Sequence, residues 1–230
     1  LTLSAAQRTF LLKSARHVSS TLRERAFMNR ISARPPAWQS GIRAGSYGAK
    51  GEGLRVVLYE GRGVASVLAR RHETNRLPAM AKQAYGLEAL PGADRWVPGV
   101  QASFVGIGPG SWLVLSNMHK HEALARDLRS KLGAGASVAD QCDARLLIGV
   151  SGPAAREVLA KGIPLDLHPR AFGRGSAATT MIRDIGVHLW QESDEPSFGL
   201  TSPRSTADSL WMWLMDAAAP YGCKAVSCTN

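Results

Sequence analysis

The stretch ARLLIGVSGPAAREVLAKG, residues 144–162, joins the two kinds of local structure that decide the fold. Its first part, 144–150, is mostly apolar and predicts a buried β-strand. The SGP at 151–153 then predicts a helix start, because Ser or Gly caps a helix and proline supplies the backbone φ of a first helical residue. We expect the helix to run to Lys161 and to end at Gly162, so strand and helix follow one another almost without a loop.

Elsewhere in the chain, strands are expected in groups that precede each helix. The expected strands span 54–60, 64–70, 101–107, 111–115, 138–141, 177–185, 187–191 and 197–201, and the further helices span 74–85, 119–132 and 203–218. The first two strands are expected to pair as a hairpin through Gly61-Arg62-Gly63. Helices that follow groups of strands favour antiparallel or mixed sheets with helices on one face, the α+β class, over a doubly wound parallel sheet. The order suggests two related ferredoxin-like halves.

The two ends of the chain are expected to lie outside the folded body. Residues 1–50 hold nine Lys/Arg and one Glu, a net charge of +8 out of +10, and 34–53 is rich in Pro, Gly and Ser. We expect a basic, poorly ordered arm and linker over 1–50, a folded domain over 54–222 and a C-terminal tail over 223–230. Three interpretations of the arm stay open: a gene-model extension or tail, an arm that folds on a partner, and a targeting or membrane-surface helix.

Composition and spacing argue against several classes of protein. The longest apolar run, 210–215, is far shorter than the roughly 18–20 residues of a membrane span. Residues 51–230 carry a net charge of +2, which argues against a nucleic-acid-binding surface on the folded body. Cys142, Cys223 and Cys228 are odd in number and lack metal-site spacing. Free thiols in a reducing cytoplasm are predicted. Taken together, these features predict a cytoplasmic protein without membrane or nucleic-acid partners.

No motif predicts a catalytic, cofactor-binding or metal-binding residue. The run 106–111 contains a proline and continues into a strand, which favours a hairpin over a phosphate-binding loop. On the expected helix His119 and His121 point in different directions and cannot bind one metal ion. Asp166-Leu167-His168 has the order of an acid and a general base, but without a third partner a turn held by side-chain hydrogen bonds is favoured. His188 alternates with apolar strand residues and is expected in a core or an interface.

The last helix, 203–218, is apolar beyond a single face. Its start resembles a capping box formed by Ser205 and Asp208. One stripe consists of Ala207, Leu210, Trp211, Leu214 and Ala218. Trp213 and Met212 project to either side of that stripe. Such a helix is either deeply buried or shared with a partner, and both interpretations stay open.

Five segments in the second half of the chain carry a family resemblance. They are SVADQ at 137–141, SGPAAREVLAKG at 151–162, DLHPRAF at 166–172, IGVHLWQ at 185–191 and PRS at 203–205. In order and spacing, the stretch from about 54 to 222 resembles the gamma subunit of heterotetrameric sarcosine oxidase. The resemblance covers about three quarters of the chain and leaves residues 1–50 outside it.

The resemblance implies both a fold and an assembly. The gamma subunit is similar in fold to part of the aminomethyltransferase-like, folate-binding proteins, and it accompanies larger alpha and beta subunits and a small delta subunit. That complex oxidises the N-methyl group of sarcosine to give glycine, formaldehyde or methylene-tetrahydrofolate, and hydrogen peroxide. The resemblance places FAD, FMN, NAD and tetrahydrofolate on other subunits and assigns no catalytic, cofactor or metal residue here. The family-motif and candidate docking residues are Asp140, Gly152, Pro153, Asp166, His168, Pro169, Arg170, Trp190, Arg204 and Trp213.

Two alternatives stay beside the expected non-catalytic subunit. The first is an autonomous tetrahydrofolate-binding or aminomethyltransferase-like protein, although full-length relatives of that kind carry an additional domain. The second is a nucleic-acid binder that works through the basic arm 1–50.

Overall fold

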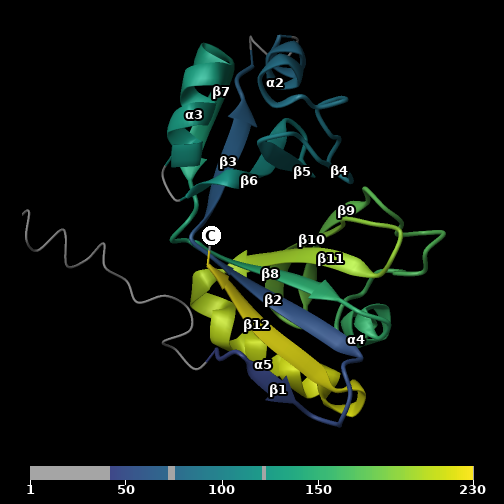
Figure 1. Ribbon diagram of the computed structural model, residues 1–230. Coiled ribbons are helices and arrows are strands. Elements are labelled where there is room, and N and C mark those ends of the chain that lie inside the picture. Colours follow the sequence, from purple (N-terminus) through teal and green to yellow (C-terminus); the bar gives the residue numbers. More distant parts are fainter. Residues whose placement is uncertain (1–41, 72–75, 121–122, 230) are drawn as a thin grey trace, which may run out of the picture. The chain divides into compact units, whose positions relative to one another are not determined.

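The computed structural model describes residues 42–71, 76–120 and 123–229, without the side chains of 117–120 and 229. The larger of its two sheets has seven strands in the order β1-β12-β2-β8-β11-β10-β9 (Figure 1). These strands are β1 (Gly45–Tyr47), β2 (Leu54–Glu60), β8 (Arg145–Ser151), β9 (Ala177–Ile182), β10 (Ile185–Gln191), β11 (Ser197–Pro203) and β12 (Cys223–Thr229). All neighbouring pairs are antiparallel except β12 and β2, which are parallel.

The second sheet has five strands in the order β4-β5-β6-β3-β7. These are β3 (Arg62–Ala69), β4 (Trp96–Val97), β5 (Ala102–Gly108), β6 (Ser111–Lys120) and β7 (Ala136–Asp140). Every neighbouring pair in it is antiparallel. β5 and β6 are joined at Gly108-Pro109-Gly110, as the hairpin interpretation of that glycine-rich run predicts.

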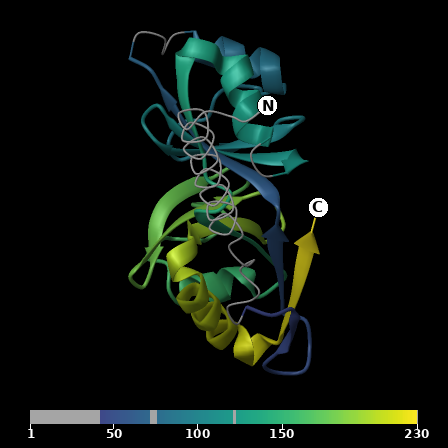
Figure 2. The same ribbon diagram turned by 90° about the vertical axis from the view of Figure 1, so that its left-hand side faces the viewer.

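Helices cover one face of each sheet (Figures 1 and 2). On the seven-stranded sheet, α4 (Ala155–Ala160) and α5 (Ala207–Ala218) share a buried core with the strands. On the five-stranded sheet, α2 (Leu77–Tyr85) and α3 (Ala123–Leu132) do the same. The 3-10 helices are η2 (Gly133–Gly135), η3 (Arg204–Thr206) and η4 (Ala219–Tyr221). The predicted α+β class, with antiparallel and mixed sheets and helices on one face, is confirmed.

A smaller core joins the two sheets. It contains Leu147, Ala177 and Trp190 from the seven-stranded sheet and Val105 and Leu113 from the five-stranded sheet, among others. Because side chains alternate along a strand, Leu147, Ala177 and Trp190 lie on the face of the seven-stranded sheet opposite α4 and α5. That face, which we call the inter-sheet face, is therefore only partly available to anything outside the chain.

The predicted hairpin between the first two strands is wrong. β2 pairs with β12 and β8, whereas β3 pairs with β6 and β7. Only Gly61, at φ 73°, separates Glu60 at the end of β2 from Arg62 at the start of β3. Because the shortest common hairpin loops have two residues, the chain passes here from one sheet into the other.

The predicted tail at 223–230 is also wrong for 223–229. These residues form β12, which lies between β1 and β2 (Figure 1). Cys223 and Ala225 alternate into the core beneath α5. Part of the expected arm and linker is likewise folded, since Ile42 is fully buried and 45–47 forms β1. Residues 1–41 of that arm lie outside the described residues.

The expected helix boundaries need correction at three starts. β6 extends to Lys120 and α3 begins at Ala123, so His119 lies in a strand and His121 outside the described residues. α4 begins at Ala155 without a side-chain cap, because Ser151 still pairs in β8. α5 begins at Ala207 after a 3-10 turn, and the predicted capping box does not form.

The expected strands 177–185 and 187–191 leave a break at Gly186, but the turn lies two residues earlier. Ile182 and Ile185 are paired in register, so the turn between β9 and β10 consists of Arg183 and Asp184. Gly186 is a strand residue that pairs with Met181. No helix in the described part of the chain combines the length and hydropathy of a transmembrane segment.

Candidate functional site

Arg156 on α4 links three of the five family segments. Its guanidinium donates through Nη1 to the backbone oxygens of Leu167 and Phe172 (3.1 Å for Phe172) and through Nη2 to Oε1 of Gln191 (3.0 Å). It also lies 5.2 Å above the ring of Phe198. One half-buried side chain therefore holds the loop that follows α4 against β10. We call residues 163–176 the motif loop.

Within the motif loop, short-range hydrogen bonds form the turn that the sequence predicts. Oδ1 of Asp166 accepts from the backbone N–H of His168 at 2.8 Å, and Nδ1 of His168 accepts from that of Arg170 at 3.2 Å. Leu167 and Phe172 are buried, while Asp166, His168, Pro169 and Arg170 are exposed. Nδ1 of the His168 ring thus accepts a hydrogen bond from the backbone, and the rest of the ring is exposed to solvent.

A groove of about 540 Å³ lies beside α5. It is lined by Lys161, Ile182, Arg183, Asp184, Ile185, Ser209, Met212, Trp213, Asp216 and Ala217. Two cationic and two anionic side chains balance one another there. Lys161 is engaged by its own chain, because Nζ donates to the Ala217 oxygen at 2.7 Å and lies 4.6 Å above the Tyr221 ring. The groove therefore lacks the single-sign charge that selects a charged ligand.

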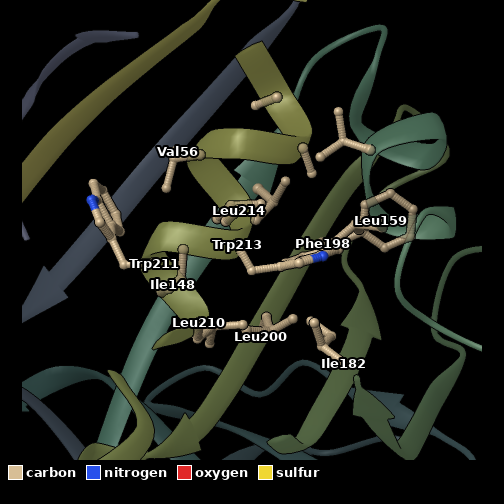
Figure 3. Close-up of a cluster of buried hydrophobic side chains, with 14 of the residues drawn as sticks. Val56, Ile148, Leu159, Ile182, Phe198, Leu200, Leu210, Trp211, Trp213 and Leu214 are labelled. Carbon is tan, nitrogen blue, oxygen red and sulfur yellow. The ribbon is translucent and has the colours of Figure 1, made fainter. Parts of the chain in front are cut away.

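The position of Trp213 agrees with the first interpretation of the last helix, that it is deeply buried. It is buried, and a Cβ added at Gly162 would lie 2.4 Å from its ring, so the glycine makes room for the indole. Trp211 leaves α5 in another direction (Figure 3) and meets Tyr47 edge-on at 6.2 Å. Met212 remains 66% exposed. Both tryptophans thus belong to the chain's own core, and the exposed apolar surface of α5 is at Met212.

Trp190 is also a packing residue. It is 1% exposed in the core between the sheets, and a Cβ added at Gly199 on β11 would lie 2.0 Å from it. Its indole N–H donates to Oε1 of Glu192 at 2.9 Å. The family segment IGVHLWQ therefore supplies an aromatic that joins the two sheets.

The remaining family-motif residues organise the ends of strands. Oδ1 of Asp140 accepts from the Cys142 backbone N–H at 2.9 Å just after β7. Gly152 has φ 113° and passes Gly53 so closely that a Cβ would lie 2.7 Å from its oxygen; the exposed Pro153 follows. The Arg204 backbone N–H donates to the Ala144 oxygen at 2.8 Å.

The cysteines are free thiols, as predicted. Burial raises the pKa of Cys142 to about 12 and that of Cys223 to about 11, so both stay protonated at neutral pH. Within the described residues, no three His, Cys, Asp or Glu side chains gather as candidate metal ligands.

Sequence reasoning missed Arg156 and Arg145. The acceptors of Arg156 are mostly backbone oxygens 11 and 16 residues away, which leave no trace in residue spacing. Arg145 is half-buried on β8, beside His188. The sequence clue to Arg145 is that a charged residue begins the otherwise apolar run RLLIGV.

Comparisons with known proteins agree over most of the chain. The model of the "Sarcosine oxidase, gamma subunit family" matches residues 73–220. The sarcosine oxidase subunit gamma of Corynebacterium sp. (strain U-96) is 31% identical over 71% of this chain and 87% of that protein. The subunit from Corynebacterium sp. (strain P-1) is 35% identical over 53% of this chain, and the match spans 59% of that relative's length.

Solved structures give the same result. The heterotetrameric sarcosine oxidase from Corynebacterium sp. U-96 has a chain that matches with a TM-score of 0.65 and 28% identity, over 76% of this chain and 88% of that one. The glycine cleavage system aminomethyltransferase T from Bartonella henselae matches at a TM-score of 0.56 with 14% identity, over 76% of this chain and 48% of that one, and shows the fold alone. Since the family match runs across both sheets and the same relation holds in sequence and in structure, the chain belongs to the sarcosine oxidase gamma subunit family.

Proposed function

We propose that this chain is the non-catalytic gamma subunit of a heterotetrameric sarcosine oxidase in the cytoplasm, and that it supports assembly with alpha, beta and delta subunits. The complex would demethylate sarcosine oxidatively to glycine, with formaldehyde or methylene-tetrahydrofolate and hydrogen peroxide as the other products. FAD, FMN, NAD and tetrahydrofolate would be held by the other subunits. The exposed residues of the motif loop, Asp166, His168, Pro169 and Arg170, are docking candidates.

The hydrogen bonds that Arg156 makes within its own chain are the observation that supports the proposal most directly. A charged residue that serves a substrate needs free hydrogen-bonding capacity in a cleft. Arg156, at the centre of the family segments, instead donates to three acceptors of its own chain. Arg156 thus holds the backbone of the motif loop in place. This supports a role in which the exposed residues of that loop contact another subunit.

Co-expression tests the assembly role. The untagged full chain would be produced with tagged alpha, beta and delta subunits and purified on the tag. We expect gamma to elute with the tagged subunits in a fixed ratio through a subsequent size-exclusion column. Elution of gamma away from the other subunits would refute the proposal.

A folate titration separates this proposal from the autonomous alternative. The resemblance to folate-binding, aminomethyltransferase-like proteins makes tetrahydrofolate the relevant probe. We expect isothermal calorimetry of the purified chain to show no saturable binding of tetrahydrofolate. Tight binding, or turnover without other subunits, would favour the alternative.

A further inference from the structure

Two basic side chains lie near each other on the inter-sheet face, and no acid among the described residues shifts the pKa of either. His188 on β10 is paired in register with Thr201, and Thr201 with Leu147 on β8. Arg145 precedes Leu147 by two residues and so points to the same side of the sheet. Leu147 lies in the core between the sheets, which places Arg145 and His188 at the margin of that core.

Arg145 contrasts with Arg156 in what surrounds it. Burial lowers the pKa of both guanidinium groups. Arg156 has three acceptors, whereas Arg145 has no hydrogen bond or ion pair with any residue that the structure describes. A partly desolvated cation without an anion is destabilising, and a carboxylate that reached it would restore the balance.

His188 lies near Arg145 on the same face of the sheet. Its Nδ1 lies 3.0 Å from Oγ1 of Thr179, and that hydroxyl donates to the Ile107 oxygen at 3.3 Å. Because the hydroxyl has a single hydrogen, it accepts from Nδ1–H, which leaves Nε2 of the neutral ring as a free proton acceptor. Burial, and then the charge of Arg145, lower the pKa of His188 to about 4. Thr179 on β9, Thr201 on β11 and Ile107 on β5 are uncharged, so within the described part Arg145 is the charge that acts on His188.

The surface next to these two side chains is exposed and apolar. Gly186 lies on the same face, two residues before His188, and a Cβ added to it would meet no atom within 4 Å. Its register partner Met181 is 48% exposed. A small inorganic anion gains nothing from an apolar rim, whereas a protein segment buries it.

We infer that Arg145 and His188, with Met181 and Gly186 beside them, form a surface site that receives an Asp or Glu side chain of a partner subunit. This inference rests on the proposed function and adds to it the surface and the chemistry of the contact. The incoming carboxylate pairs with Arg145 and accepts a hydrogen bond from His188, whose Nε2 takes up a proton from solvent. Assembly through this site is therefore coupled to protonation of one histidine.

The test uses the assembled complex and the variant Arg145→Met, which keeps an unbranched, flexible side chain and removes its charge. The apparent dissociation constant of gamma would be measured by diluting the purified complex and following the free subunit by mass photometry. We expect it to rise about 30-fold, as for loss of one member of a desolvated charge pair. Arg126→Met, at an exposed arginine on α3, is the matched control and should leave the constant unchanged.

A second variant keeps the test decisive if Arg145→Met folds poorly. His188→Gln retains an N–H for Thr179 but cannot take up a proton. Wild-type complexes should dissociate less as the pH falls from 8 to about 6, and His188→Gln complexes should lose that dependence. Equal constants for wild type and Arg145→Met, or equal pH profiles for wild type and His188→Gln, would each overturn the inference. Failure of wild-type gamma to join the complex would instead refute the proposed function.

Discussion

The two faces of the seven-stranded sheet differ in how their arginines are hydrogen-bonded and in how tightly their glycines are packed. On the face covered by α4 and α5, the guanidinium of Arg156 has three acceptors, and Gly162 gives way to the ring of Trp213. On the inter-sheet face, Arg145 has none among the described residues, and Gly186 faces empty space. The helix-covered face is complete in the isolated chain. The margin of the other face is arranged in a way that an additional polypeptide would complete.

The difference is sharpest between the two glycines. Gly162→Val is expected to destabilise the chain by about 3 kcal/mol, because the new side chain collides with the Trp213 ring at a distance that the core cannot accommodate. Gly186→Val should change stability by less than about 1 kcal/mol, since its Cβ meets nothing and a β-branched residue suits a strand. Urea denaturation of both variants measures the contrast. Equal losses would show that the two faces are packed alike.

The two arginines provide the second contrast. Arg156→Met should cost roughly 2–3 kcal/mol, because it leaves the buried oxygens of Leu167 and Phe172 without their donor. Arg145→Met should be neutral or slightly stabilising in the isolated chain, because it removes a partly desolvated charge with no partner among the described residues. Chemical denaturation and proteolysis of the motif loop would report both. A large loss for Arg145→Met would reveal a structural partner for that residue.

The pH dependence of stability tests the environment of His188. Its pKa of about 4 in the folded chain lies below the ordinary 6.5, so the unfolded chain binds more protons between these values. Its stabilising contribution is complete above pH 6.5 and is lost as the pH falls toward 4. Solvent screening at this half-buried ring reduces the loss to about 2 kcal/mol. Denaturation curves of wild type and His188→Gln should diverge across that window, and parallel curves would contradict the prediction.

The smallest effect is expected at the turn between β9 and β10, at one edge of the seven-stranded sheet. Arg183 adopts φ 53°, a left-handed conformation that costs an ordinary side chain energy and suits Asn or Gly. Arg183→Asn should therefore raise the free energy of unfolding by about 0.5–1 kcal/mol. Thermal denaturation measures the gain, and Asp184→Asn at the neighbouring position serves as the control. A decrease would mean that the Arg183 side chain contributes contacts that compensate the strain.

The course of the backbone was largely predictable, and its pairing was not. An apolar run predicts the strand over 54–60, and the polar side chains of Asp166 and His168 predict a turn, because both features depend on near neighbours. The partners of β2 are instead a strand about 90 residues on and the strand at 223–229, and no local pattern encodes such distant pairing. Trp190 and Trp213 were grouped with candidate docking residues because their matching glycines, Gly199 and Gly162, cannot be identified from the sequence alone.

The place of β12 has a consequence for how the protein emerges from the ribosome. Residues 62–140 supply all strands of the five-stranded sheet, so that sheet can form while the rest of the chain is still being synthesised. β2 is made earlier still but keeps an open backbone edge until residues 223–229 are released beside it. The seven-stranded sheet therefore stays incomplete for longer than the five-stranded one, and the open edge of β2 needs shielding until residues 223–229 have been made.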